Sequence, residues 1–127
     1  MEQAVRIIIT NDQGKILILK RNLNDIHYPG LWDVPGGGVD AGESLQEAAE
    51  RELKEECNLE MKIDKNYFNM FHHTDKQIDI YGFRVGSTGE KISLSDEHTE
   101  FKWISKDDWK NFEFIPSVTE TLKAYFK

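Results

Sequence analysis

The sequence predicts one domain of the α/β (α+β) class, in which helices pack on a mixed β-sheet. Three observations lead to this prediction. Short β-rich runs occur in two groups, and a segment with helical spacing of apolar residues follows each group. A chain of 127 residues can bury one core but is too short for two ordinary domains. Its hydrophobic fraction of 39% and charged fraction of 31% are typical of a soluble globular protein. We therefore expect residues 1–127 to form a single domain.

The N-terminal part of the chain is expected to form a β-hairpin followed by an irregular segment. Residues 4–9 and 15–19 are rich in Ile and Leu, and the connecting residues 11–14 end in a glycine that can adopt a positive φ. Residues 21–32 are polar and contain a Pro-Gly pair, which is typical of turns. Residues 32–38 are expected to form a short extended piece that runs into a glycine loop.

A helix is expected to follow the glycines. Ser44 and Glu47 have the spacing of a capping box, so Ser44 should be the N-cap residue of the helix. Asn58 is a plausible end of this helix, since Asn tolerates the left-handed conformation in which many helices stop. The apolar residues between these ends recur at helical spacing: Leu45, Ala48, Ala49 and Leu53.

The second half of the chain predicts more strands. Residues 67–73 and 78–85 should be two strands joined around Thr74–Lys76. Residues 86–98 form a polar loop rich in Gly, Ser and Glu, and residues 101–104 are expected to be another strand.

The C-terminal end predicts a short turn and a helix. Ser105 is expected to cap a turn that continues through Trp109. A second capping box within Pro116–Glu120 should start a helix whose apolar face contains Leu122, Tyr125 and Phe126. The three tryptophans are expected in the core or in a pocket wall: Trp32, Trp103 and Trp109.

Charge and cysteine content exclude several classes of protein. The net charge of −7 disfavours binding to nucleic acid or to anionic membranes. No run of 18 apolar residues predicts a transmembrane helix, and the N-terminus does not resemble a signal peptide. Cys57 is the only cysteine, which favours a cytoplasmic protein without a disulfide. Its position beside glutamates should raise the pKa of its thiol, so it is a poor nucleophile.

The predicted helix carries an unusual group of carboxylates. At about 100° per residue, Glu52, Glu55 and Glu56 fall within one arc of roughly 100°, on the same side as the apolar residues. Like charges at this spacing repel each other, and burial would make them take up protons. A divalent cation resolves the conflict, and oxygen ligands favour Mg²⁺ or Mn²⁺. The opposite, solvent-facing arc should hold Glu47, Glu50 and Lys54.

Two neighbouring features support a site for a cation and a phosphate. Arg51 can hold one of the carboxylates by a charge-assisted hydrogen bond. Gly36, Gly37 and Gly38 would allow the backbone to approach a ligand closely, just before a helix N-terminus that favours anionic oxygens. The histidines, by contrast, match no common zinc motif: His27, His72, His73 and His98.

The spacing of these residues resembles the Nudix box. The matching residues are Gly37, Glu43, Arg51, Glu52, Leu53, Glu55, Glu56 and Leu59, which are eight of the nine defined positions of the box over residues 37–59. Asn58 departs from the usual glycine, but Asn is the next-best residue for a left-handed helix end. Residues 31–38 and 97–103 also look like MutT-type Nudix proteins, and this resemblance implies a Nudix-type α/β/α sandwich with a mixed β-sheet.

The resemblance implies roles for the metal-binding and catalytic residues. Glu52, Glu55 and Glu56 match metal ligands, and the carbonyl group of Gly37 matches a backbone ligand. Glu97 matches a further metal ligand or the general base, so either Glu52 or Glu97 is expected to take the proton from water. The remaining residues of the box have supporting roles: Arg51 would orient the carboxylates, and Glu43 would be structural or a distant ligand.

The resemblance also implies a substrate. Arg21 matches a basic residue that contacts phosphate, and Tyr28, Gly36 and Gly38 are expected to line the substrate site. The implied protein is an Mg²⁺-dependent hydrolase of a nucleoside diphosphate linked to a group X, most simply a nucleoside triphosphate pyrophosphohydrolase that releases a nucleoside monophosphate and pyrophosphate. Its partner would be a small nucleotide, and the chain would be a monomer or homodimer.

Three alternatives stay open at this point. A nucleotide-sugar or dinucleoside polyphosphate hydrolase would use the same box. A non-catalytic nucleotide-binding sensor would have the same fold. Specificity for oxidised guanine nucleotides has no marker, because Ile115 or Pro116 occupies the place of the asparagine that reads the base in MutT.

Overall fold

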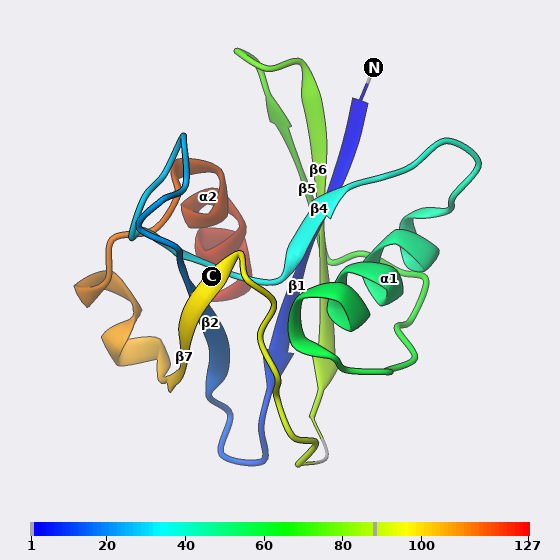
Figure 1. Ribbon diagram of the computed structural model, residues 1–127. Helices are drawn as coiled ribbons and strands as arrows, with labels where there is room; N and C mark the ends of the chain where they lie inside the picture. Colours follow the sequence, from blue (N-terminus) through cyan, green and yellow to red (C-terminus); the bar gives the residue numbers. More distant parts are fainter. Residues whose placement is uncertain (1, 88) are drawn as a thin grey trace.

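The computed structural model describes residues 2–87 and 89–127, which form a mixed sheet with a helix on each face (Figure 1). The strand order is β3-β2-β1-β6-β5, while β4 pairs with β1 and β7 pairs with β2. Strands β1 and β6 are parallel and all other pairs are antiparallel, so the predicted mixed sheet and sandwich are confirmed. The elements are β1 (Glu2–Thr10), β2 (Ile16–Arg21), β3 (Trp32–Asp33), β4 (Gly36–Gly38), α1 (Leu45–Cys57), β5 (Asn69–His73), β6 (Ile78–Gly86), β7 (His98–Ile104), a 3-10 helix (Lys106–Asn111) and α2 (Pro116–Tyr125).

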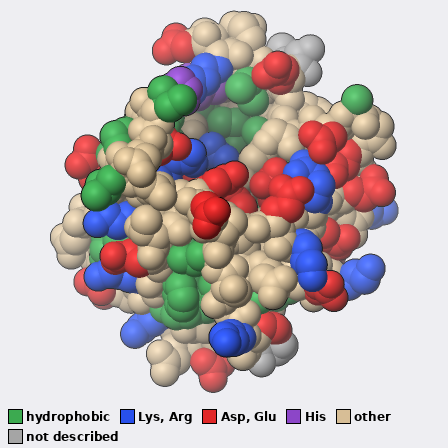
Figure 2. Space-filling model, viewed as in Figure 1, with side chains coloured by type: hydrophobic (Ala, Val, Ile, Leu, Met, Phe, Trp, Pro, Cys, Tyr) green, Lys and Arg blue, Asp and Glu red, His purple; other side chains and the backbone are tan. Residues whose placement is uncertain are grey.

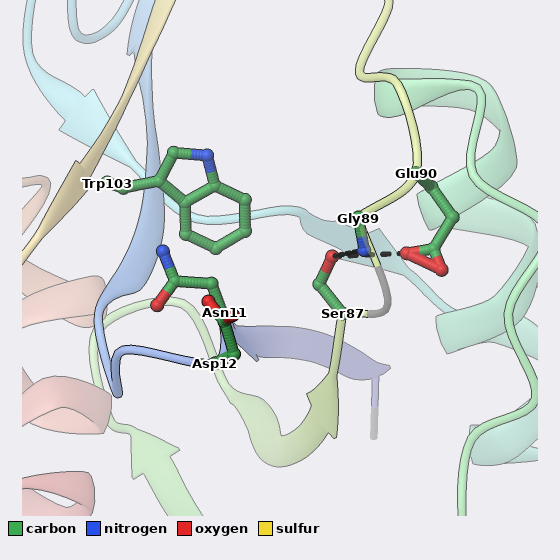
Figure 3. Close-up of a pocket in the computed structure, with 6 residues that line it drawn as sticks. All are labelled: Asn11, Asp12, Ser87, Gly89, Glu90 and Trp103. Atoms are coloured by element: carbon green, nitrogen blue, oxygen red, sulfur yellow. Dashed lines mark hydrogen bonds between the residues drawn. The ribbon is translucent and has the colours of Figure 1, made fainter.

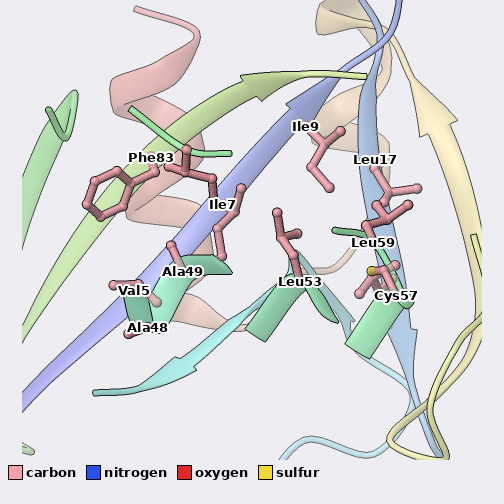
Figure 4. Packing of buried hydrophobic residues seen from close by; sticks show 12 residues of the cluster. Val5, Ile7, Ile9, Leu17, Ala48, Ala49, Leu53, Cys57, Leu59 and Phe83 are labelled. Atoms are coloured by element: carbon pink, nitrogen blue, oxygen red, sulfur yellow. The ribbon is translucent and has the colours of Figure 1, made fainter. Parts of the chain in front are cut away.

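The central strand β1 separates two hydrophobic clusters. Successive side chains of a strand point to opposite faces of a sheet, so Ile7 and Ile9 pack on one face and Ile8 on the other. The first cluster lies beneath α1, where Leu53 and Cys57 contact the sheet residues (Figure 4). The second cluster lies beneath α2. Both faces of β1 are therefore buried, which explains its continuous apolar sequence.

The predicted ends of α1 are confirmed. The hydroxyl oxygen of Ser44 accepts a hydrogen bond from the Glu47 backbone, and the Glu47 carboxylate accepts one from the Ser44 backbone. Asn58 ends the helix in the left-handed conformation, with φ 57° and ψ 37°. Local sequence thus fixes the length of α1 and the direction in which it presents its carboxylates.

The hairpin and the later strands agree with the sequence except at their ends. Gly14 has a φ of 75°, as the turn between β1 and β2 requires, and the side chain of Asn11 accepts hydrogen bonds from two backbone N–H groups of that turn. Strand β7 begins at His98, three residues earlier than predicted. The predicted loop over 86–98 includes residue 88, which lies outside the described residues.

The predicted side-chain cap of the C-terminal helix is wrong, whereas Ser105 is the N-cap residue of the 3-10 helix as expected. The C-terminal helix α2 is capped by Ile115 with Pro116 in its first turn, and no side chain supplies a capping hydrogen bond. Ser117 is instead buried and accepts a hydrogen bond from Arg6, so it is not available as a cap. Ser105 bonds the Asp108 side chain, but it makes no capping bond to the backbone.

No helix in the described residues is long and apolar enough to span a membrane.

Candidate active site

The three consecutive glycines form strand β4, not the predicted loop. Residues 36–38 pair with residues 4–6 of β1, and the glycines lie beside the middle of α1, away from its N-terminus. The backbone N–H of Gly36 donates a hydrogen bond to Glu56 Oε1 at 2.8 Å. A Cβ atom on Gly37 would lie 2.6 Å from Glu52 Oε1. Gly37 therefore makes room for Glu52 and the backbone of Gly36 binds Glu56, so the predicted role at a helix N-terminus is wrong.

The carboxylates of α1 divide into a buried pair and an exposed residue. Glu52 and Glu56 are only 8% and 4% exposed. The side chain of Glu55 is 56% exposed, so the prediction that all three continue the buried face is correct for two of them. On the opposite side, Glu50 is half-buried, because its carboxylate accepts a hydrogen bond from the Ile63 backbone.

The buried carboxyl groups hold protons more strongly than ordinary glutamates. Burial raises the pKa of Glu56 to about 9, and the nearby charge of Asp33 and a hydrogen bond with Glu97 add to the effect. Burial also raises the pKa of Glu52, although Arg51 opposes the change. Two neighbouring buried acids whose pKa values are both raised are the condition that a divalent cation would relieve.

Arg51 holds this group of carboxylates in place. Its guanidinium donates hydrogen bonds to Glu43 at 2.7 Å, to Glu52 at 2.8 Å and to Glu55 at 3.2 Å. It also donates to the carbonyl oxygen of Gly38 at 2.9 Å. Glu43, foremost among these partners, raises the pKa of Arg51, so the guanidinium stays charged. The arrangement supports the predicted orienting role of Arg51 and a structural role for Glu43.

Residues from β7 and β3 complete the acidic group, and sequence reasoning did not find all of them. Glu56, Glu97 and His98 each offer a ligand atom within 4.8 Å of the others. The His98 side chain is fully buried, and neither ring nitrogen has a hydrogen-bond partner among the described residues. Its Nε2 atom lies 3.7 Å from Oδ2 of the buried Asp33. The pairing of β7 and of β3 with β2 brings His98 and Asp33 to this group, so no local spacing could have indicated these two residues.

This donor set fits a divalent cation. It consists of carboxylate oxygens with one imidazole nitrogen, and the orphaned nitrogens of His98 face a group of acids. Oxygen-rich sites favour Mg²⁺ or Mn²⁺, and an imidazole ligand is compatible with Mn²⁺ and later transition metals. Burial raises the pKa of Glu52, and the charge of Glu97 adds to this effect. Glu52 therefore lies next to the group of Glu56, Glu97 and His98.

The predicted substrate residues are divided between a cavity and strand β4. Arg21 and Tyr28 line a cavity of about 170 Å³ between β1, the loop before β3 and the start of α2. Arg21 is held there by Asp25 at 2.6 Å and by Asp33 at 2.9 Å. Gly36 and Gly38 have their polar atoms engaged by Glu56 and Arg51, as described above.

The surface next to these residues combines opposite charges. Figure 2 shows a hollow with basic and histidine side chains at its border and a patch of acidic side chains beside it. The carboxylates around Arg51 form an acidic group of this kind, and the cavity that Arg21 lines contains basic and histidine side chains. A phosphorylated compound that is bound through cations at the acids could place its remaining part in this hollow.

A second cavity, of about 450 Å³, does not belong to this group (Figure 3). Its described lining is Asn11, Asp12, Ser87, Gly89, Glu90 and Trp103, and it includes none of the predicted site residues.

Of the three tryptophans, Trp32 and Trp109 are in the core beneath α2, and Trp103 lines this second cavity. None of the three lines the cavity beside Arg21.

Comparisons with known proteins agree with this geometry. A family model of the NUDIX domain matches residues 2–124. The chain is 34% identical over 105 residues to a putative 8-oxo-dGTP diphosphatase of Bacillus subtilis (strain 168), a match that covers 81% of this chain and 66% of that protein. It is 27% identical over 128 residues to the nucleoside triphosphatase NudI of Salmonella arizonae, covering 91% of this chain and 90% of the relative. The crystal structure of a MutT protein from Methanosarcina mazei Go1 is 30% identical and covers 98% of this chain and 91% of its own, with a TM-score of 0.83.

Proposed function

Because this chain belongs to the NUDIX family of pyrophosphohydrolases, we propose that it hydrolyses a nucleoside triphosphate to a nucleoside monophosphate and pyrophosphate. The observation that carries the proposal is the group of Glu56, Glu97 and His98, whose ligand atoms lie within 4.8 Å of one another. These residues would hold Mg²⁺ or Mn²⁺, and a bound cation would supply the positive charge that lets a chain of net charge −7 bind a polyanion.

The residues around the site would have different roles in metal binding, proton transfer and substrate binding. Glu52, Glu56, Glu97 and His98 would hold the metal, with Glu55 at the exposed edge and the Gly37 carbonyl as a further candidate ligand. When bound, a divalent cation neutralises phosphate charge and acidifies water. Glu52 or Glu97 takes the proton of the attacking water, and Arg51 keeps the Glu52 carboxylate oriented through its 2.8 Å hydrogen bond. Arg21, fixed by Asp25 and Asp33, faces the phosphate end of the cavity, and Tyr28 packs against the nucleoside.

The remaining parts of the proposal concern the protein as a whole. We place it in the cytoplasm, acting on a small nucleotide as a monomer or homodimer, with residues 1–127 as one domain.

A substrate screen tests the proposal. Purified protein is incubated with Mg²⁺ or Mn²⁺ and a panel of nucleoside triphosphates, nucleotide sugars and dinucleoside polyphosphates, and the products are separated by anion-exchange chromatography. We expect a nucleoside monophosphate and pyrophosphate from at least one triphosphate, and no products in the presence of a chelator. Turnover restricted to nucleotide sugars or dinucleoside polyphosphates would contradict the triphosphate assignment, and metal-independent turnover would contradict the site.

Substitution of Gly37 by alanine should disable the enzyme through one added methyl group. The new Cβ would lie 2.6 Å from Glu52 Oε1 and 2.7 Å from its carboxyl carbon, so the carboxylate must leave its position. We expect kcat to fall by about 100-fold or more, as for other small displacements of catalytic groups. Gly86→Ala is the matched control, since a Cβ there meets nothing within 4 Å. Equal activity of the two variants would show that the position of Glu52 against β4 is unimportant.

A further inference from the structure

The cavity beside Arg21 has an unusual lining for this acidic chain. Its walls include the apolar side chains of Ile78, Ile80 and Ile115, and its charged side chains are Arg6, Arg21 and Lys76. Of the described residues that line it, none is Asp or Glu. Its volume of about 170 Å³ is below the several hundred Å³ of pockets that enclose a whole drug-sized ligand. The cavity therefore suits one flat ring system that presents hydrogen-bond acceptors.

The three basic residues are not equivalent. Arg21 has its charge matched by Asp25 and Asp33, at 2.6 Å and 2.9 Å, although its Nε atom is buried without a hydrogen-bond partner among the described residues. The ammonium group of Lys76 lies 5.5 Å from the centre of the Tyr28 ring, which is a cation–π distance.

The guanidinium group of Arg6 is only partly satisfied by hydrogen bonds. Its Nη2 atom donates a long hydrogen bond of 3.4 Å to the hydroxyl oxygen of Ser117. Its Nε atom is buried and has no hydrogen-bond partner among the described residues. A buried donor without an acceptor costs free energy, and a ligand that supplies the acceptor recovers it.

We propose that Arg6 selects the base of the substrate, favouring a purine that has a keto group at position 6. This inference rests on the proposed function, because it assigns the cavity to the base of the nucleotide. A guanidinium has only donors. Guanine offers two acceptors, O6 and N7, that match them, and Arg pairs with this edge more often than with any other base edge. Adenine has an amino group in place of O6, so one donor of Arg6 would face another donor.

The fold explains why Arg6 can reach a bound base while the phosphates stay at the acids. Arg6 lies on β1 directly opposite Gly36 of β4, and the Gly36 N–H bonds Glu56. One strand thus separates the guanidinium from Glu56, while its charge still reaches Asp33 of the same group. Ser117, on the first turn of α2, holds the Arg6 side chain on the cavity side of the sheet. A nucleotide that lies across β4 would contact Arg6 with its base and the acidic group with its phosphates.

The test compares inosine triphosphate with ATP. Hypoxanthine has the O6 and N7 acceptors of guanine without its 2-amino group, so the comparison removes the 2-amino group and leaves a difference only at position 6 and the adjacent N1. We expect kcat/KM for inosine triphosphate and for GTP to exceed that for ATP by about 10- to 100-fold. Arg6→Met should bring the ratio of inosine triphosphate to ATP close to one, mainly by lowering the value for inosine triphosphate.

Two further variants separate selectivity from general effects. Arg84→Met removes the same charge from an exposed position on β6 and should keep the wild-type ratio. Arg6→Lys retains the charge but loses the paired donors, so its ratio should fall between those of wild type and Arg6→Met. It also serves as the test if Arg6→Met fails to fold, as judged by circular dichroism.

The outcomes distinguish this inference from the proposed function. Turnover with a wild-type ratio of one or less, or a ratio that neither Arg6 variant changes, overturns the role of Arg6 and leaves the enzyme assignment standing. If no triphosphate is hydrolysed, binding of inosine triphosphate and ATP is compared by calorimetry. Preferential binding of inosine triphosphate that Arg6→Met abolishes supports Arg6 while the proposed function fails, and equal or absent binding overturns both.

Discussion

Replacement of Glu52 by glutamine is expected to lower kcat by about 100- to 10,000-fold, the range seen when a general base is removed. Glu52 is 8% exposed, lies against Gly37 and accepts a hydrogen bond from Arg51 at 2.8 Å. Glutamine has the same shape and can still accept that bond, but it cannot take a proton from water. The effect should therefore appear in turnover at saturating substrate.

The fold should survive this substitution. Burial raises the pKa of Glu52, which means that the neutral form is favoured at this position. An uncharged amide of the same size satisfies that preference, so the melting temperature in the absence of metal should stay close to that of wild type.

Three measurements decide what Glu52 does. Glu100→Gln removes the same charge from an exposed position on β7 and should retain full activity. Binding of Mn²⁺, followed by electron paramagnetic resonance, separates a base from a ligand: a base variant binds Mn²⁺ normally and a ligand variant binds it more weakly. Full activity of Glu52→Gln would remove Glu52 from the mechanism, and a large loss in Glu97→Gln would then assign the base to Glu97.

Local features of the site were predictable because short-range rules control them. The capping box at Ser44 and the left-handed end at Asn58 depend on residues within a few positions, and both are present as expected. Once the ends and the period of α1 are fixed, the burial of Glu52 and Glu56 on its inner face follows. The resistance of Cys57 to ionisation was also expected, although burial contributes more than Glu56 to raising its pKa to about 12.

Features that depend on pairing between distant strands were not predictable. His98 and Asp33 approach Glu56 because β7 and β3 both pair with β2, an arrangement that no sequence spacing encodes. The glycines were interpreted as a loop because glycine is usually found in turns, whereas here they form a strand that must come close to α1. Ser117 has the spacing of a cap, but contact with Arg6 across the sheet determines its role. Glu55 lies at the edge of the predicted arc, where a small rotation exposes it.

The stability of the metal-free protein should fall as the pH rises, and Glu56 should account for much of the change. Its pKa is about 9 in the folded chain and near 4.5 as an ordinary glutamate, because burial disfavours its charged form. The folded state therefore binds the proton more tightly than the unfolded state does. The resulting stabilisation is fully present below pH 4.5, decreases as the pH rises, and is lost above about pH 9. Glu52, whose pKa is also raised by burial, changes stability in the same direction.

Three other groups whose pKa values are shifted titrate outside this window. The pKa of Asp25 is lowered to about 2 by its hydrogen bond from Arg21, and the pKa of Glu43 is lowered by Arg51, so both affect stability only in acid. The thiol of Cys57 has a pKa of about 12, so its ionisation affects stability only at strongly alkaline pH. Between pH 6 and pH 8.5 the part of the slope that Glu56→Gln removes should consequently reflect the carboxyl group of Glu56.

Thermal unfolding in the presence of a chelator measures this slope. Between pH 6 and pH 8.5 we expect the melting temperature of the wild type to fall by on the order of 10 °C. Glu56→Gln, which imitates the protonated acid, should fall much less and should be the more stable protein at pH 8.5. Glu100→Gln should behave as wild type. Added Mg²⁺ or Mn²⁺ should stabilise the wild type more at pH 8.5 than at pH 6, because the metal binds the deprotonated carboxylate and competes with its proton. Identical slopes for the wild type and Glu56→Gln would show that this carboxyl group is already ionised at neutral pH, and that the site is organised for a cation by some other group.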